Sequence, residues 1–139
     1  MDHYESRTAK SGCTPEDIYG FVTDIRNFKR FIPAGSVNDW QADADTCSFN
    51  VSHLGSVKMG IDAKEPYSLV SFRGTAMKNN HFEMHLHINR TEDNTAAVHL
   101  ELNTQLNPFI KMVAAKPIGQ FLEMIAGRIE NFDCSELTR

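Results

Sequence analysis

This chain of 139 residues lacks several features that mark common classes of protein. It has no apolar run approaching the roughly 18 residues of a membrane-spanning helix, so we expect no stable membrane insertion. Its three cysteines, Cys13, Cys47 and Cys134, form no C-x-x-C pair, which argues against a zinc knuckle or a redox motif. We expect all three to be buried or half-buried free thiols.

The sequence also lacks an excess of positive charge and the short motifs of common catalytic sites. The chain has 14 basic and 18 acidic residues and a net charge of -4, so we expect no nucleic-acid partner. No G-x-S-x-G motif and no glycine-rich phosphate loop occurs, and we expect no catalytic residue, cofactor or metal. Residues 1–7 hold acids where a signal peptide would be basic, which predicts a cytoplasmic location.

The overall composition of the chain is typical of one globular domain, which we expect to cover residues 1–139. Hydrophobic residues make up 41% of the chain, charged residues 23%, and the mean hydropathy is -0.37. A chain of this length can bury a core of useful size without disulfides or metals.

The N-terminal part predicts one short strand followed by two short helices. The strand covers residues 4–8. Thr14 can cap the first helix and Pro15 suits its first position, with apolar residues following at helical spacing as far as Ile25. The second helix is expected at residues 27–32.

Between residues 37 and 103 apolar and polar residues alternate, and turn signals interrupt them at residues 43–45, 54–55, 65–66, 79–80 and 92–94. Alternation places successive side chains on opposite faces, so this stretch predicts an antiparallel sheet with one buried face. Residues 108–132 then follow a helical period. The predicted fold class is α+β, with a curved seven-stranded antiparallel sheet wrapped around a long C-terminal helix.

The inner sheet face and the long helix are expected to leave a space between them. Its predicted lining is apolar and rich in methionine, and consists of Phe49, Met59, Phe72, Met84, Leu86, Leu100, Met112, Phe121 and Ile125. Such walls suit an adaptable pocket for an apolar ligand, although the same side chains could simply fill the core. His53 and Arg73, near strand ends, could contact an acidic head group at the mouth.

Several local features of the chain are informative together: the helix at residues 14–22, the segment at residues 27–33, Trp40, Glu65-Pro66-Tyr67 before a strand, and Leu106-Asn107-Pro108 before the last helix. With this order of elements the chain resembles the helix-grip fold of the START/SRPBCC superfamily over residues 3–133. It looks most like small single-domain bacterial members of the polyketide cyclase and lipid-transport branch. The resemblance implies a cavity for apolar ligands, although the superfamily also hosts cyclases, hydrolases and partners of other proteins.

The polar side of two neighbouring predicted strands carries several histidines and glutamates, namely His81, Glu83, His85, His87, His99 and Glu101. Imidazoles spaced in this way can ligate a metal. A plain polar outer face is the simpler interpretation, and an interface between subunits, as in a homodimer, is a third.

The leading functional hypothesis is a non-enzymatic protein that binds a small hydrophobic or amphipathic ligand, lipid-like or polyketide-like, in the cavity. An enzyme of the cyclase or dehydratase type would need an ionisable side chain facing that cavity, and the candidates are Tyr4, Tyr19, His53 and Arg73. An interaction module that uses the outer sheet face is the remaining alternative.

Overall fold

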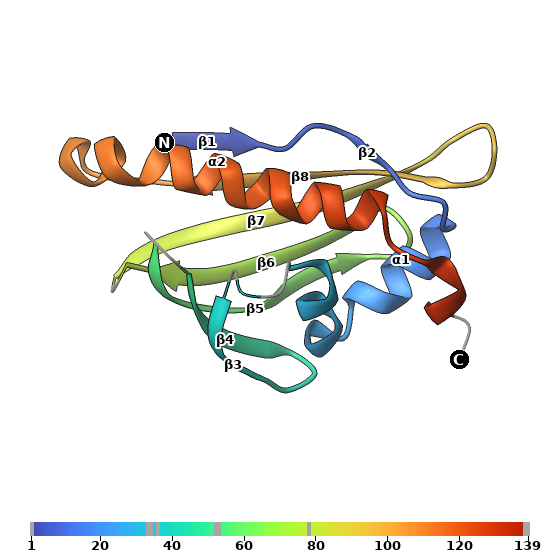
Figure 1. Cartoon of the computed structure of the whole chain (residues 1–139), viewed down its shortest axis with the longest axis horizontal. Coiled ribbons are helices and arrows are strands. Elements are labelled where there is room, and N and C mark those ends of the chain that lie inside the picture. Colours follow the sequence, from blue (N-terminus) through green and yellow to red (C-terminus); the bar gives the residue numbers. More distant parts are fainter. Residues whose placement is uncertain (1, 33–34, 36, 52–53, 78, 138–139) are drawn as a thin grey trace.

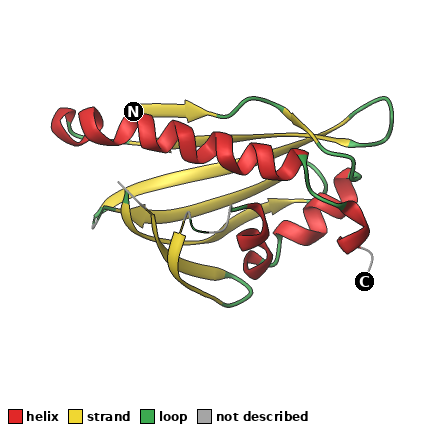
Figure 2. Cartoon of the chain, viewed as in Figure 1, coloured by secondary structure: helices red, strands yellow, loops and turns green. Residues whose placement is uncertain are grey.

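A computed structural model describes residues 2–32, 35, 37–51, 54–77 and 79–137. It shows one antiparallel sheet with a long helix lying along one face (Figures 1 and 2). The strands are β1 (Asp2–Glu5), β2 (Ala9–Lys10), β3 (Val37–Ala42), β4 (Thr46–Val51), β5 (Gly55–Glu65), β6 (Leu69–Ala76), β7 (Asn80–Arg90) and β8 (Ala96–Thr104).

The strands are ordered β1-β8-β7-β6-β5-β4-β3, and β2 also pairs with β8. The predicted first strand at residues 4–8 is therefore two short strands that follow one another along β8. Ser6 lies between them, and its side-chain Oγ accepts a hydrogen bond from the Leu100 amide at 2.9 Å. A side-chain oxygen thus takes a place that a backbone carbonyl fills in a regular ladder, which interrupts the strand.

The helices begin where the capping signals predict. Helix α1 (Pro15–Val22) starts after Thr14, whose Oγ1 accepts a hydrogen bond from the Asp17 amide. Helix α2 (Pro108–Glu130) starts after Asn107, whose Oδ1 accepts one from the Ile110 amide. Two 3₁₀ segments, η1 (Ile25–Phe31) and η2 (Cys134–Leu137), complete the elements.

The core lies between the sheet and the helices. Along β6, β7 and β8, alternate apolar side chains point inward and are buried, while their neighbours lie on the outer face of the sheet. Helix α2 contacts β1, β2 and β8, and α1 and η1 contact the middle strands. The fold is the α+β helix-grip arrangement predicted from the alternation, with a sheet that grips one long helix.

Ion pairs fasten α2 to the N-terminal strand. Lys111 Nζ lies 2.7 Å from Asp2 Oδ1, and the hydrogen bond from Lys111 lowers the pKa of the Asp2 carboxyl. Farther along the helix, the Arg7 guanidinium lies 2.9 Å from Glu123 and 2.8 Å from Glu130. These contacts fix the helix along the β1 edge of the sheet at two separate points.

The expectation of three free thiols is wrong, because Cys13 and Cys134 form a disulfide. The two cysteines are 121 residues apart, and nothing in the sequence indicates that they pair. They meet because η2 returns to the N-terminal end of α1. Cys47 is the free cysteine. Stable disulfides are typical of oxidising compartments, so this bond lends no support to the predicted cytoplasmic location, which stays a prediction.

Reduction of this disulfide should strongly destabilise the protein. Closing a loop of about 100 residues restricts the unfolded chain, and losing the closure should lower the free energy of unfolding by about 3–5 kcal/mol. Urea unfolding with and without dithiothreitol measures the difference. A Cys13→Ala/Cys134→Ala variant should match the reduced protein and respond to dithiothreitol no further. Equal stability of oxidised and reduced wild-type protein would contradict this account.

Gly74 marks a place where two backbones approach closely. A Cβ atom at this position would lie 2.0 Å from the carbonyl oxygen of Lys58 and 2.8 Å from Cα of Met59 on β5. We expect Gly74→Ala to lower the free energy of unfolding by about 2 kcal/mol or more, since β5 and β6 must move apart. Gly119→Ala in α2, where a Cβ would meet nothing within 4 Å, is the matched control and should be neutral or stabilising. Equal losses in both variants, measured by urea unfolding, would refute the close approach.

Candidate functional site

An apolar pocket of about 60 Å³ lies between α2 and the inner face of the sheet. Its walls come from the middle of α2, from the β4–β5 connection and from the β6–β7 connection. The described lining residues are Phe28, Phe49, Val51, Leu54, Val57, Met59, Ala76, Met77, Asn80, Phe82, Met84, Leu102, Thr104, Ile118, Phe121 and Leu122. The pocket therefore sits toward the end of the sheet where these two hairpins turn.

Four of the predicted lining residues do line this pocket: Phe49, Met59, Met84 and Phe121. Four others are fully buried in the surrounding core, namely Phe72, Leu86, Leu100 and Ile125. They share the inward face but lie farther along the sheet, where the helices cover it. Contact of any of these side chains with a ligand stays a prediction.

Met112 does not line the pocket, because its side chain is 84% exposed. The buried face of α2 contains Ala114, Ile118 and Leu122. Met112 precedes Ala114 by two residues, or about 200° around a helix, and so faces away from the sheet. The helical period of residues 108–132 alone does not fix which side of the helix faces the sheet.

The two polar side chains of the described lining each donate a hydrogen bond to a backbone carbonyl. Thr104 Oγ1 donates a hydrogen bond to the carbonyl of His81 at 2.7 Å, and Asn80 Nδ2 donates one to the carbonyl of Met77 at 3.1 Å. Among the lining residues that the structure describes, none is ionisable. The walls thus offer a ligand mainly methyl, methylene and aromatic surface.

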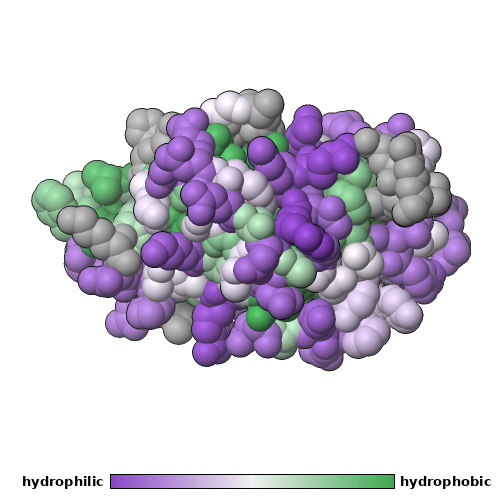
Figure 3. Space-filling model, turned by 90° about the horizontal axis from the view of Figure 1, so that it is seen from below, coloured by the Kyte–Doolittle hydropathy of each residue, from purple (hydrophilic) through white to green (hydrophobic). Residues whose placement is uncertain are grey.

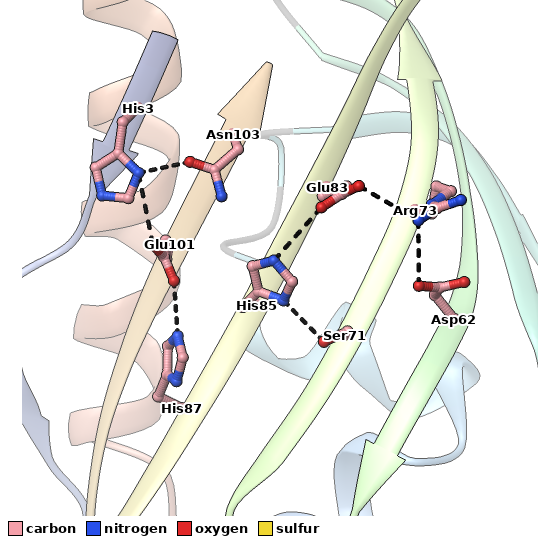
Figure 4. Close-up of polar contacts among 9 residues, drawn as sticks. All are labelled: His3, Asp62, Ser71, Arg73, Glu83, His85, His87, Glu101 and Asn103. Carbon is pink, nitrogen blue, oxygen red and sulfur yellow. Dashed lines mark hydrogen bonds and ion pairs between the residues drawn. The ribbon is translucent and has the colours of Figure 1, made fainter. Parts of the chain in front are cut away.

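The predicted polar contacts at the mouth find no support. Arg73 is exposed on the outer face, 3.3 Å from Glu83 and 3.7 Å from Asp62 (Figure 4), because the inward positions of β6 belong to its neighbours. His53 lies outside the described residues.

Two other candidates for catalysis, Tyr4 and Tyr19, do not belong to the described lining. The Tyr4 hydroxyl is buried with no hydrogen-bond partner among the described side chains and backbone.

Sequence reasoning missed the residues that close the hairpin end of the pocket, including Val57, Ala76 and Met77. Met77 has a backbone φ of 52°, in the left-handed region that methionine rarely adopts. The inward alternation of β5 and β6 could have indicated Val57 and Ala76. The strained turn position of Met77 carries no comparable signal.

The first turns of α2 present apolar side chains to solvent. Phe109 is 80% exposed and Val113 63% exposed, and both lie beside Met112 on this part of the helix. Figure 3 shows hydrophobic surface at the end of the molecule where α2 begins. Within the described chain, no helix is long and apolar enough to cross a membrane.

The histidines of β7 and β8 lie on the outer face of the sheet, opposite the pocket. His85 Nδ1 is 2.8 Å from Ser71 Oγ, and His87 Nε2 is 2.8 Å from Glu101 Oε1 (Figure 4). The inward neighbours of these histidines, Met84 and Leu86, are buried. The alternation therefore predicted the correct face for them.

Comparisons with known proteins identify the fold. No family model matches the chain, and no curated protein matches its sequence. The structure of XoxI from Bacillus cereus gives a TM-score of 0.73 at 7% identity, with 94% of each chain covered. That of TTHA0849 from Thermus thermophilus gives 0.66 at 12%, covering 99% of this chain and 100% of the other.

DynU16, a protein of the dynemicin biosynthetic locus, gives a TM-score of 0.63 at 14% identity. The alignment covers 95% of this chain but 47% of DynU16, so this chain spans about half of that protein. Identities this low show a shared fold and nothing finer.

Cys47 should be unreactive in the folded protein. Burial, and to a smaller extent the nearby Asp43 carboxylate, raises the pKa of its thiol to about 12. Very little thiolate then exists at pH 8, and the thiolate is the reactive form. We expect Ellman's reagent to leave the native, oxidised protein unmodified and to label one thiol once urea unfolds it. Fast labelling without urea would contradict this environment.

Proposed function

We propose that this protein binds a small hydrophobic or amphipathic ligand, lipid-like or polyketide-like, in the pocket between α2 and the sheet, without catalysis. The observation that carries the proposal is the chemistry of the lining, which is apolar apart from two side chains already hydrogen-bonded to backbone. On the described walls a charged substrate would find no ionisable partner and would lose its hydration. An apolar ligand gains roughly 25 cal/mol for each Å² that it buries.

The size of the pocket sets a condition on this binding. A volume of 60 Å³ is well below the roughly 150 Å³ of a cavity that accepts benzene, so a larger ligand must displace side chains. Met59, Met77 and Met84 are suited to this because their side chains are unbranched and flexible. The pocket would therefore widen around its ligand by rotation of side chains.

The shared fold adds modest support to a polyketide-like ligand, since DynU16 belongs to a biosynthetic locus. Membership of the START/SRPBCC superfamily, with its apolar cavity, is part of the same proposal. An enzyme of the cyclase or dehydratase type would need an ionisable group in the pocket. The described lining supplies none, which favours binding over catalysis.

Two opposite changes to the pocket test the proposal with the uncharged fluorescent probe N-phenyl-1-naphthylamine. Ala76→Leu places a larger side chain in the space and should weaken probe binding about tenfold or more. Phe121→Ala enlarges the space and should strengthen binding, while lowering the free energy of unfolding by about 3 kcal/mol. Fluorescence titration gives the dissociation constants.

Met112→Ala is the matched control, because Met112 lies on the same helix but faces solvent. Its affinity for the probe should equal that of the wild-type protein. If Met112→Ala weakens binding while Ala76→Leu does not, the probe binds the exposed start of α2 and the pocket proposal fails. Thermal unfolding of each variant confirms that the protein titrated is folded.

A further inference from the structure

Three adjacent strands bring imidazoles and carboxylates together on the outer face of the sheet, far from the pocket lining. We call this group the outer histidine cluster. It consists of His3 and Glu5 on β1, His99 and Glu101 on β8, and His87 on β7. The strand register pairs Glu5 with Glu101 and His87 with His99.

The centre of the cluster has the spacing of a metal site. One donor atom from each of His3, Glu5 and Glu101 lies within 4.8 Å of the other two. The His3 ring nitrogens are 3.5 Å from Glu101 Oε2 and 3.6 Å from Glu5 Oε2. Ligand atoms around a tetrahedral zinc ion are roughly 3.3 Å apart, so these side chains would rotate to bring their donor atoms into coordination. Figure 4 shows His3 and Glu101 pointing toward one another.

Two more imidazoles border this centre. His87 Nε2 is 2.8 Å from Glu101 Oε1, and His99 Nε2 is 4.0 Å from Glu5 Oε1. The two rings stack on each other with centroids 4.6 Å apart. Each of these imidazoles thus contacts one carboxylate of the centre and is a candidate for the fourth ligand.

The electrostatics of the cluster favour a cation. Glu5 and Glu101 are direct cross-strand partners, and two like charges in this position repel one another. The ion-pair partners that the structure shows for both carboxylates are histidines. A metal cation between the two carboxylates would offset their repulsion.

We propose that the outer histidine cluster binds one divalent transition-metal ion, with Zn²⁺ as the best fit. His3, Glu5 and Glu101 would be ligands, and His87 or His99 would complete the site. Mixed imidazole and carboxylate ligands suit zinc, nickel or copper, whereas magnesium and calcium prefer oxygen ligands alone. The ion would cross-link β1, an edge strand of four residues, to its neighbour β8.

Isothermal titration of the metal-free protein with Zn²⁺ tests this proposal. We expect one ion per chain, a rise in the thermal unfolding midpoint, and no competition from excess Mg²⁺. Binding should weaken at acidic pH, because protons compete with the metal for the ligand atoms. His3→Ala and Glu101→Gln should each reduce the affinity about tenfold or more.

His81→Asn is the matched control, since His81 lies on the same face of β7 but outside the cluster. It should bind Zn²⁺ as the wild-type protein does. Co²⁺ gives a second measurement, because its visible absorption becomes strong when it is bound in a tetrahedral site. The proposal is overturned if several ions bind per chain, or if His81→Asn loses binding while His3→Ala and Glu101→Gln keep it.

Discussion

The packing of α2 against the inner face of the sheet is the interaction on which the other parts depend. Leu122, Ile125 and Ile129 of the helix are fully buried, as are Leu86 and Leu100 of the sheet. Burying a side chain of this kind is worth roughly 1.5–3 kcal/mol. Without the helix this face would be open to water, and the sheet could not hold its shape as a separate layer. The pocket lies within this contact, toward the hairpin end of the sheet.

Different restraints hold the two ends of α2. Near its start, Lys111 pairs with Asp2, and the apolar side chains around Met112 remain in solvent. Near its end, Arg7 pairs with Glu130, and the disulfide lies just beyond. The part of the helix that lines the pocket, around Ile118 and Leu122, lies between these two ends, and its buried side chains face the sheet.

Most of the fold could be predicted from the sequence, because period-two alternation and capping residues are local signals. Thr14 and Asn107 mark the starts of both helices, and Met84 with Leu86 marks the inward face of β7. The errors arose where distant parts of the chain meet. The spacing of Cys13 and Cys134 along the sequence does not indicate that they pair. Predicting that Met112 is exposed requires knowing how α2 is rotated about its own axis. The pocket depends on how two hairpins and a helix approach one another, which no local pattern records.

The two faces of the sheet have separate chemistry, although they share the same strands. On β7 the inward Met84 lines the pocket, while the outward His87 contacts Glu101. Changes to one face therefore leave the side chains of the other in place. A single strand can carry an apolar lining and a polar cluster because its side chains alternate.

The disulfide has a consequence for the covalent connectivity of the chain. It joins Cys13, before α1, to Cys134, after α2, so that nearly the whole sheet lies within one closed ring. A protease that cuts one peptide bond inside this ring, for example in the β7–β8 turn at Asn94, opens the ring but releases no fragment. The two pieces stay joined at sulfur, and the strands on either side of the cut keep their partners.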